Sequence, residues 1–154
     1  MYPLLSSHLF LAVFFSPLIN SRVALATILR WVHYPLLGRV SREAFVEYEE
    51  ENIRRTGRVV IPVMAVELIT ALLLVWEPPA GILPRQAWLN LALLGRIWLS
   101  TFTLQLPYHG LLLKKFNHAV WLSLARTNWI RTAAWTSRGI LLLFLLREVW
   151  AKGS

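Results

Sequence analysis

The chain has 154 residues, of which 56% are hydrophobic and 16% are charged, and its mean hydropathy is +0.53. A soluble domain is typically about 45–50% apolar and about 25% charged, so this composition favours a lipid environment and excludes a long disordered chain. The sequence contains 16 Lys and Arg residues, 8 Glu residues, and neither Asp nor Cys. The lack of Cys excludes disulfides, iron–sulfur clusters and covalently attached c-type haem. The length indicates one domain, residues 1–154.

The first apolar region covers residues 8–33 and is interrupted by Asn20, Ser21 and Arg22. We expect one long, tilted membrane span here. A cleaved signal peptide is the alternative, with Ala24–Ala26 as its cleavage site. No positive charge precedes the apolar core, which favours the uncleaved span.

An amphipathic helix is expected after this span. Ser41 can cap a helix that runs to about Thr56. Phe45 and Ile53 fall near one face of this helix, and charged residues surround them in the sequence. The pattern predicts a helix that lies at the membrane interface, and Gly57 follows it.

Three further apolar segments are close to the length of a membrane span, about 20 residues. They cover residues 59–76, 87–113 and 128–147. Thr127 can cap the last of them, after a basic connection at residues 114–126. The sequence therefore predicts an all-α fold: a four-helix transmembrane bundle with an interfacial amphipathic helix between the first and second spans.

The distribution of Lys and Arg predicts how the spans are oriented. Residues 34–58 and 114–126 contain eight Lys and Arg residues, whereas the opposite side contains three. Because cytoplasmic loops are enriched in these residues, we expect both termini in the periplasm of a multi-pass protein of the bacterial inner (cytoplasmic) membrane. The expected partners are the lipid bilayer and other membrane subunits. Anionic lipid explains the basic charge without nucleic acid.

Three ionisable residues fall near the middle of the predicted spans. Glu67, Arg96 and Arg138 each lie about nine residues from a span end, which corresponds to about 13 Å of helix. Each would be costly in hydrocarbon without a partner. We therefore expect an ion pair of Glu67 with Arg96 or Arg138. Two roles for this ion pair remain open: it locks the bundle together, or it forms part of a substrate or proton site.

A second polar group is predicted nearer the cytoplasmic side. Helical spacing places Gln105 with His109, and Arg131 with Trp135, on shared faces. The candidate substrate-binding residues are Gln105, His109, Asn128, Arg131 and Trp135. They predict a pocket that opens toward the cytoplasmic leaflet. A b-type haem between His33 and His109 is an alternative, but metal-ligand spacings such as H-x-x-H are absent, so neither a cofactor nor a metal site is expected.

Several of these motifs resemble a family of small bacterial four-helix membrane proteins of unknown function. The resemblance covers about residues 31–146. Its most specific segments are Gln105-Leu106-Pro107-Tyr108-His109 and Thr127-Asn128-Trp129-Ile130-Arg131-Thr132. That family is distantly similar to anthrone-oxygenase-like membrane proteins, which are thought to be oxygenases without a cofactor.

The chain departs from this family at two places. Where the family carries histidines in its interfacial helix, this chain has Glu49-Glu50-Glu51-Asn52. The family's Gly-Phe-Asp after the third span corresponds here to Lys115-Phe116-Asn117. The departures favour a non-catalytic role.

Our first expectation is therefore a non-catalytic accessory or structural subunit of a larger membrane complex, such as a respiratory or photosynthetic one. The alternative is a membrane-embedded oxygenase-like or isomerase-like enzyme acting on a lipophilic aromatic or quinone-like substrate. His109 would then be the general base, and Arg131 would stabilise an enolate or phenolate. This alternative requires a cavity that reaches His109. A small-molecule transporter that uses Glu67 is a third hypothesis.

Overall fold

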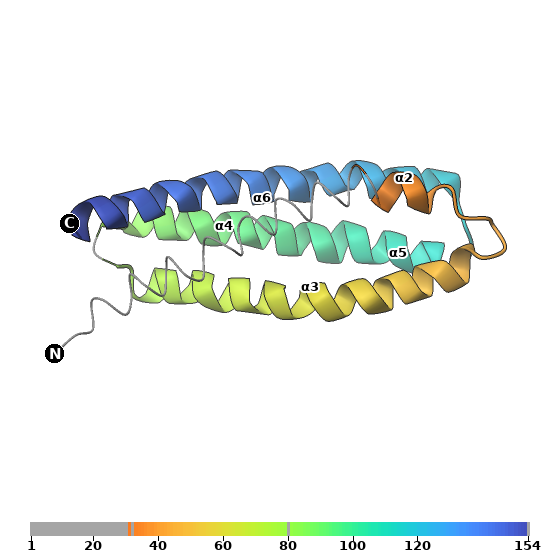
Figure 1. Ribbon diagram of the computed structural model, residues 1–154, viewed down its shortest axis with the longest axis horizontal. Coiled ribbons are helices and arrows are strands. Elements are labelled where there is room, and N and C mark those ends of the chain that lie inside the picture. The colour runs from red at the N-terminus through yellow and green to blue at the C-terminus, as the bar shows by residue number, and fades with distance from the viewer. Residues whose placement is uncertain (1–30, 32, 80, 154) are drawn as a thin grey trace.

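The computed structural model describes residues 31, 33–79 and 81–153, and in this part of the chain it is helical with no strand. The helices are α2 (Tyr34–Leu37), α3 (Phe45–Trp76), α4 (Pro84–Ser100), the π-helical segment η2 (Thr101–Gln105), α5 (Leu106–Leu112) and α6 (His118–Gly153). Helix α3 is the first of three long rods (Figure 1). The second rod consists of α4, η2 and α5, which follow one another without a gap, and the third rod is α6. Helix α2 lies beside the rods. The expected span at residues 8–33 falls almost entirely outside the described residues.

The expected break between an interfacial helix and the second span is wrong. Helix α3 continues from Phe45 to Trp76, through both Gly57 and Pro62. Glycine within a helix costs only about 1 kcal/mol, which tertiary packing can offset. Pro62 has no N–H to donate to the carbonyl one turn earlier, and α3 bends near its middle (Figure 1). The Ser41 hydroxyl accepts the Ala44 N–H at 3.3 Å, so Ser41 closes the turn that precedes the helix.

The second rod corresponds to the predicted segment 87–113. It begins with Pro84, a residue favoured in the first helical turn, and the Gln86 side chain accepts the Leu83 N–H at 2.8 Å. Near its other end, the Leu106 N–H bonds to the carbonyl of Thr101, five residues back. Pro107 follows directly and cannot donate a helical hydrogen bond. The π-helical segment thus immediately precedes the proline.

The third rod, α6, begins earlier than expected. The Asn117 side chain accepts the Ala119 N–H at 2.9 Å and the Val120 N–H at 3.3 Å, which caps the helix before His118. The prediction that Thr127 is the cap is therefore wrong. The Thr127 hydroxyl lies inside the helix and donates to the carbonyl of Ser123 at 2.7 Å. The segment expected to be a connection is the first part of one continuous helix.

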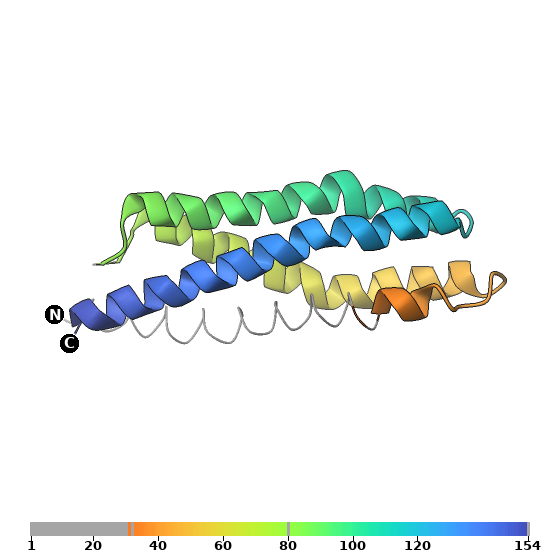
Figure 2. The same cartoon turned by 90° about the horizontal axis from the view of Figure 1, so that it is seen from above.

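Three clusters of buried apolar side chains follow one another along the rods. One end holds Leu74, Ile82, Ala87, Leu142, Leu145 and Val149; the middle holds Met64, Ala71, Leu94, Ile97, Ala134 and Trp135; and the other end holds Leu37, Phe45, Leu112, Leu124 and Ala125. Figure 1 shows the second rod between α6 and α3, and Figure 2 shows α6 crossing obliquely in front of α3. All three rods contribute to each cluster, and α2 joins them in the last one through Leu37, so the core is continuous along the long axis.

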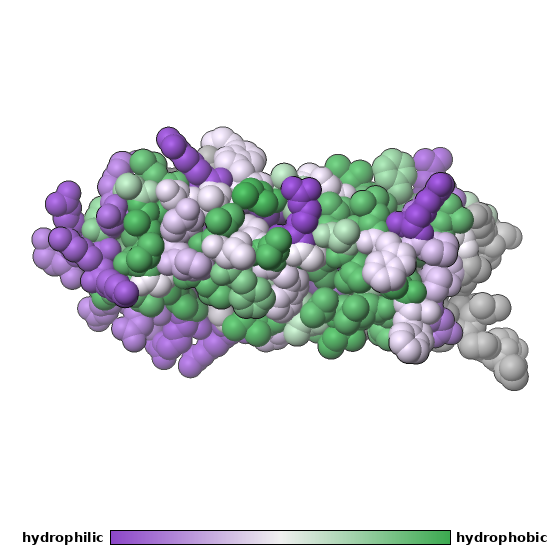
Figure 3. Space-filling view, turned by 180° about the vertical axis from the view of Figure 1, so that it is seen from behind, coloured by the Kyte–Doolittle hydropathy of each residue, from purple (hydrophilic) through white to green (hydrophobic). Residues whose placement is uncertain are grey.

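The outer surface is strongly apolar along much of its length. Figure 3 shows charged groups gathered at the end where α3 begins, with hydrophobic side chains covering much of the middle. Of the described helices, α3 alone is long and apolar enough to cross a membrane. Only 28% of its most apolar stretch is buried, so this stretch faces mainly outward. Val59, Ile61 and Trp76 are among its exposed side chains.

Candidate functional site

A buried carboxylate and an imidazole form a pair between α3 and α5. Glu49 is fully buried, and its Oε1 is hydrogen-bonded to Nδ1 of His109, whose side chain is 19% exposed. The Asn52 amide donates to the other carboxylate oxygen of Glu49 at 3.2 Å. Both oxygens of the carboxylate therefore have a partner. Burial of a charged group is strongly unfavourable unless the group is paired and hydrogen-bonded in this way.

A guanidinium from α6 lies at the same level. Arg131 donates through Nε, at 3.0 Å, and through Nη2, at 2.6 Å, to the side-chain oxygen of Asn128. Its Cζ lies over the Trp135 ring, 5.6 Å from the ring centroid. Asn128 is fully buried, so these contacts hold the guanidinium in one orientation.

Gln105 reaches this level from the π-helical segment. Its side chain is buried, and Nε2 donates to the Thr127 hydroxyl at 3.0 Å. The extra residue in a π turn rotates the side chains that follow it, relative to an α-helix, and such turns often occur at functional sites. We call Glu49, Gln105, His109 and Arg131 the open polar layer.

A cavity of about 530 Å³ adjoins this layer. Its polar lining residues are His33, Asn52, Thr56, Thr101, Gln105, His109 and Arg131, and its apolar lining includes Val60, Ile61, Met64, Trp98, Phe102, Leu106, Leu113 and Trp135. The size falls within the range of small-molecule pockets, about 300–1,000 Å³. The cavity is thus mainly apolar, with a set of hydrogen-bonding groups within it.

His33 lines the same cavity. His33 and His109 are the pair that a b-type haem would require, and they share the cavity. The described residues contain no group of three His, Cys, Asp or Glu side chains arranged to hold a metal ion.

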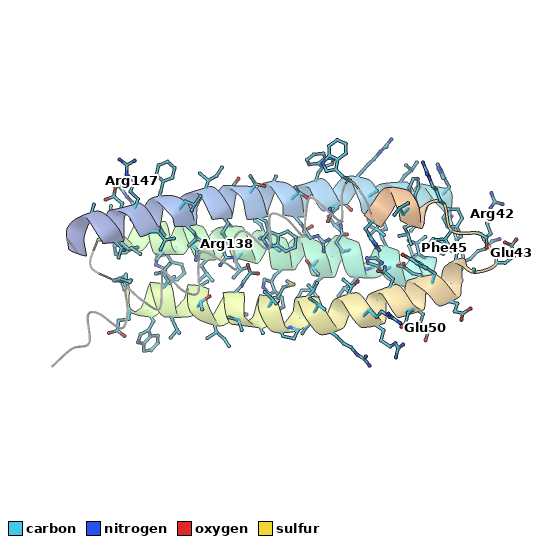
Figure 4. The ribbon with its side chains drawn as sticks, viewed as in Figure 1. Arg42, Glu43, Phe45, Glu50, Arg138 and Arg147 are labelled. Atoms are coloured by element: carbon cyan, nitrogen blue, oxygen red, sulfur yellow. The ribbon has the colours of Figure 1, made fainter. Side chains whose placement is uncertain are left out.

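A second polar layer lies deeper along the rods. Arg138 donates through Nη1 to Glu67 Oε1 at 2.8 Å and through Nε to the Asn90 side-chain oxygen at 2.9 Å. The side chains of the ion pair are only 5% and 4% exposed. Figure 4 shows Arg138 lying among the rods, whereas Arg147 points outward. We call Glu67, Asn90 and Arg138 the sealed polar layer.

The structure distinguishes the two arginines that were alternatives for Glu67. Arg138 makes the pair, and Arg96 is exposed on α4, away from it. The buried face of α4 carries Asn90, Leu94 and Ile97, and the Arg96 side chain lies outside this face. Of the two predicted alternatives, the pairing of Glu67 with Arg138 is therefore correct and the pairing with Arg96 is wrong.

Most of the predicted pocket residues meet at one place. Gln105, His109, Arg131 and Trp135 line the cavity, while Asn128 lies behind Arg131 and holds it. Sequence reasoning missed Glu49, because three consecutive glutamates suggested a solvated surface. A signal was present: Glu49 follows Phe45 by four residues, and both are buried on the same face of α3.

The tryptophan and phenylalanine that form the apolar wall were also missed. Trp98 and Phe102 lie one turn apart, with ring centroids 5.5 Å from each other, and both line the cavity. Their i, i+4 spacing is the available signal, but it is shared by ordinary core residues. No protein-family model, curated protein or solved structure matches this chain.

Proposed function

We propose that the protein is a multi-pass membrane protein, in which residues 8–33 supply a first span and the three rods supply the others. The outward-facing apolar stretch of α3 supports this arrangement. So do the exposed hydrophobic side chains of the second and third rods, among them Leu99, Phe102, Leu143 and Phe144. The location in a bacterial inner membrane, with both termini in the periplasm, and the resemblance to small four-helix membrane proteins remain predictions.

The function that we propose is that of a membrane-embedded enzyme acting on a lipophilic aromatic or quinone-like molecule. The observation that carries this proposal is the cavity beside the Glu49–His109 pair. An apolar wall with a few polar groups suits a molecule that is mostly hydrocarbon and has one oxygenated end. A purely structural bundle has no need for a cavity at this position.

Three polar groups at the cavity have a chemical task in this proposal. His109 takes a proton from an acidic O–H or C–H of the substrate, and that electron pair stays on the substrate as an enolate or phenolate. Arg131 stabilises the resulting negative oxygen, because it is a fixed cation in a site of low polarity. Gln105 orients the oxygenated end by hydrogen bonding. Trp98 and Phe102 contact the ring of the substrate.

Binding of a naphthoquinone to the purified protein in detergent tests this proposal. The probes are a hydroxynaphthoquinone and a methyl analogue that lacks the hydroxyl. We expect saturable binding of both, and the hydroxyl compound should bind about tenfold more weakly after Arg131→Gln. Arg96→Gln is the matched control, because Arg96 is exposed and does not line the cavity. If neither compound binds saturably, the proposal is wrong.

A second candidate, the accessory subunit expected from the sequence, is favoured by the exposed aromatic residues. Trp31, Trp76 and Trp88 are 72%, 89% and 60% exposed. Large exposed aromatic side chains suit contacts with lipid headgroups or with another protein. Purification from native membranes in a mild detergent separates the candidates. A stoichiometric partner supports the subunit, and a chain that always purifies alone contradicts it.

A further inference from the structure

Glu49 differs from the glutamates that surround it. Glu50 is exposed and points away from the rods (Figure 4), and Glu51 forms ion pairs with Arg54 and Arg55 at the surface. Glu49 has no exposed surface. A carboxylate is rarely buried unless it is held by partners, so its position calls for a specific explanation.

The contacts of Glu49 fix its carboxylate in one orientation. One oxygen meets Nδ1 of His109, and the other accepts the Asn52 amide at 3.2 Å. The Thr56 hydroxyl donates to the Asn52 side-chain oxygen at 3.2 Å, which holds the amide in turn. Glu49, Asn52 and Thr56 all belong to α3, so one helix presents a preformed acceptor to a histidine on another helix.

This geometry decides which nitrogen of His109 carries the proton. A carboxylate oxygen can only accept a hydrogen bond, so Nδ1 of His109 must be the donor. In the neutral ring, Nε2 is then the nitrogen with a lone pair. When Nε2 takes a proton, the negative charge of Glu49 stabilises the imidazolium. The other ionisable groups at the cavity are His33 and Arg131, and both face the same space.

We propose that Glu49 is a positioning residue that holds His109 with its proton on Nδ1 and so keeps Nε2 able to accept a proton within the cavity. The role of Nε2 as a general base toward a substrate rests on the proposed function. The tautomer itself does not, because it can be measured in the protein without any ligand. Failure of this inference and failure of the proposed function are therefore distinguishable.

The test is nitrogen NMR of the full-length protein, labelled with ¹⁵N only in histidine and held in detergent micelles. The signal of His109 is identified by its loss in His109→Asn. In the unsubstituted protein we expect about a tenfold excess of the Nδ1–H form over the Nε2–H form. Free imidazole rings in water favour the Nε2–H form, so the opposite preference is diagnostic. A His109 ring protonated mainly on Nε2 overturns the inference without any change to Glu49.

Substitution of Glu49 tests whether its carboxylate sets the tautomer. Glu49→Leu removes the acceptor, so we expect the His109 ring to shift toward the Nε2–H form that free imidazole favours. Glu49→Asp keeps a carboxylate and should retain part of the Nδ1–H preference. Glu50→Gln is the matched control and should leave the preference unchanged. An unchanged Nδ1–H preference in Glu49→Leu contradicts the inference, and the measurement on the unsubstituted protein remains decisive if a variant does not fold.

Discussion

Each of the two polar layers contains a buried glutamate paired with a basic side chain, but the surroundings of the two pairs differ. The sealed polar layer joins Glu67 and Arg138 with both side chains almost fully buried, and none of its residues lines the cavity. In the open polar layer, Glu49 is equally buried, but its partner His109 faces the cavity. A buried acid joins two helices in the sealed polar layer, whereas in the open polar layer it contacts an imidazole that lines a cavity.

The difference between the layers comes from the volume around them. Two of the residues that line the cavity, Gly57 and Gly110, have no side chain to fill it. The cavity also adjoins the π-helical segment that ends at Gln105. Around Arg138, the helical positions one turn before and one turn after it carry Ala134 and Leu142, which belong to buried apolar clusters and do not line the cavity. Space, rather than charge, distinguishes the two layers.

The largest expected effect concerns the sealed polar layer. Arg138→Met removes the guanidinium that neutralises Glu67, and we expect a loss of about 3–5 kcal/mol in the free energy of unfolding. Unfolding in detergent, followed by circular dichroism against denaturant, measures it. The double variant Glu67→Leu with Arg138→Met is the control. Because it removes both charges, it should recover most of the loss, and a double variant as unstable as the single one would contradict an ion pair at this position.

A second prediction concerns the end of the molecule beyond the open polar layer. A Cβ atom added at Gly38 would lie 2.6 Å from Cζ2 of Trp121, which is far inside normal contact. Gly38→Ala must therefore displace the indole, and we expect a loss of about 1–3 kcal/mol. The same unfolding measurement checks it. Trp121→Leu in the Gly38→Ala background should lessen the effect, since the smaller side chain leaves room for the methyl group.

Sequence reasoning predicted the helices better than their ends. Apolar runs located α3, α4 and α6, but they did not identify the core, since most of the apolar stretch of α3 faces outward. Continuity through Pro62 was predicted, since the expected span 59–76 contains it. Continuity through Gly57 could not be predicted, because local propensity is overridden by contacts such as Phe45 against Phe116, at 4.7 Å between ring centroids. These contacts tie the first turns of α3 to the rest of the molecule.

Which face each polar residue occupies was partly predictable. Helical spacing grouped Gln105 with His109 correctly, since both belong to one rod and both line the cavity. It could not distinguish Arg96 from Arg138, because both are surrounded by apolar residues in the sequence and the rotation of each helix depends on its neighbours. The burial of Glu49 could not be predicted for the same reason, since its partner His109 lies 60 residues away along the chain.

The comparison of the layers also predicts that the cavity can be filled without unfolding the protein. In Gly57→Phe the new Cβ meets only Ile61 Cδ1, at 3.7 Å, and the ring can enter the cavity of about 530 Å³ that Gly57 lines. We expect the affinity for the naphthoquinone probes to fall about tenfold or more, with no loss of stability. Gly95→Phe, on the exposed side of α4, is the control and should bind as before. Unchanged affinity in Gly57→Phe would show that the probes bind elsewhere.

The smallest expected effect comes from Gly57→Ala. Alanine favours a helix over glycine by about 1 kcal/mol, and the added methyl group makes only an ordinary contact with Ile61, so α3 should gain stability by about that amount. Denaturant unfolding measures the gain, and probe binding should change by less than about twofold, since one methyl group is small beside a cavity of about 530 Å³. A destabilised Gly57→Ala would instead mean that α3 needs glycine here to bend. The open polar layer would then depend on the curvature of this helix as well as on the space that glycine leaves.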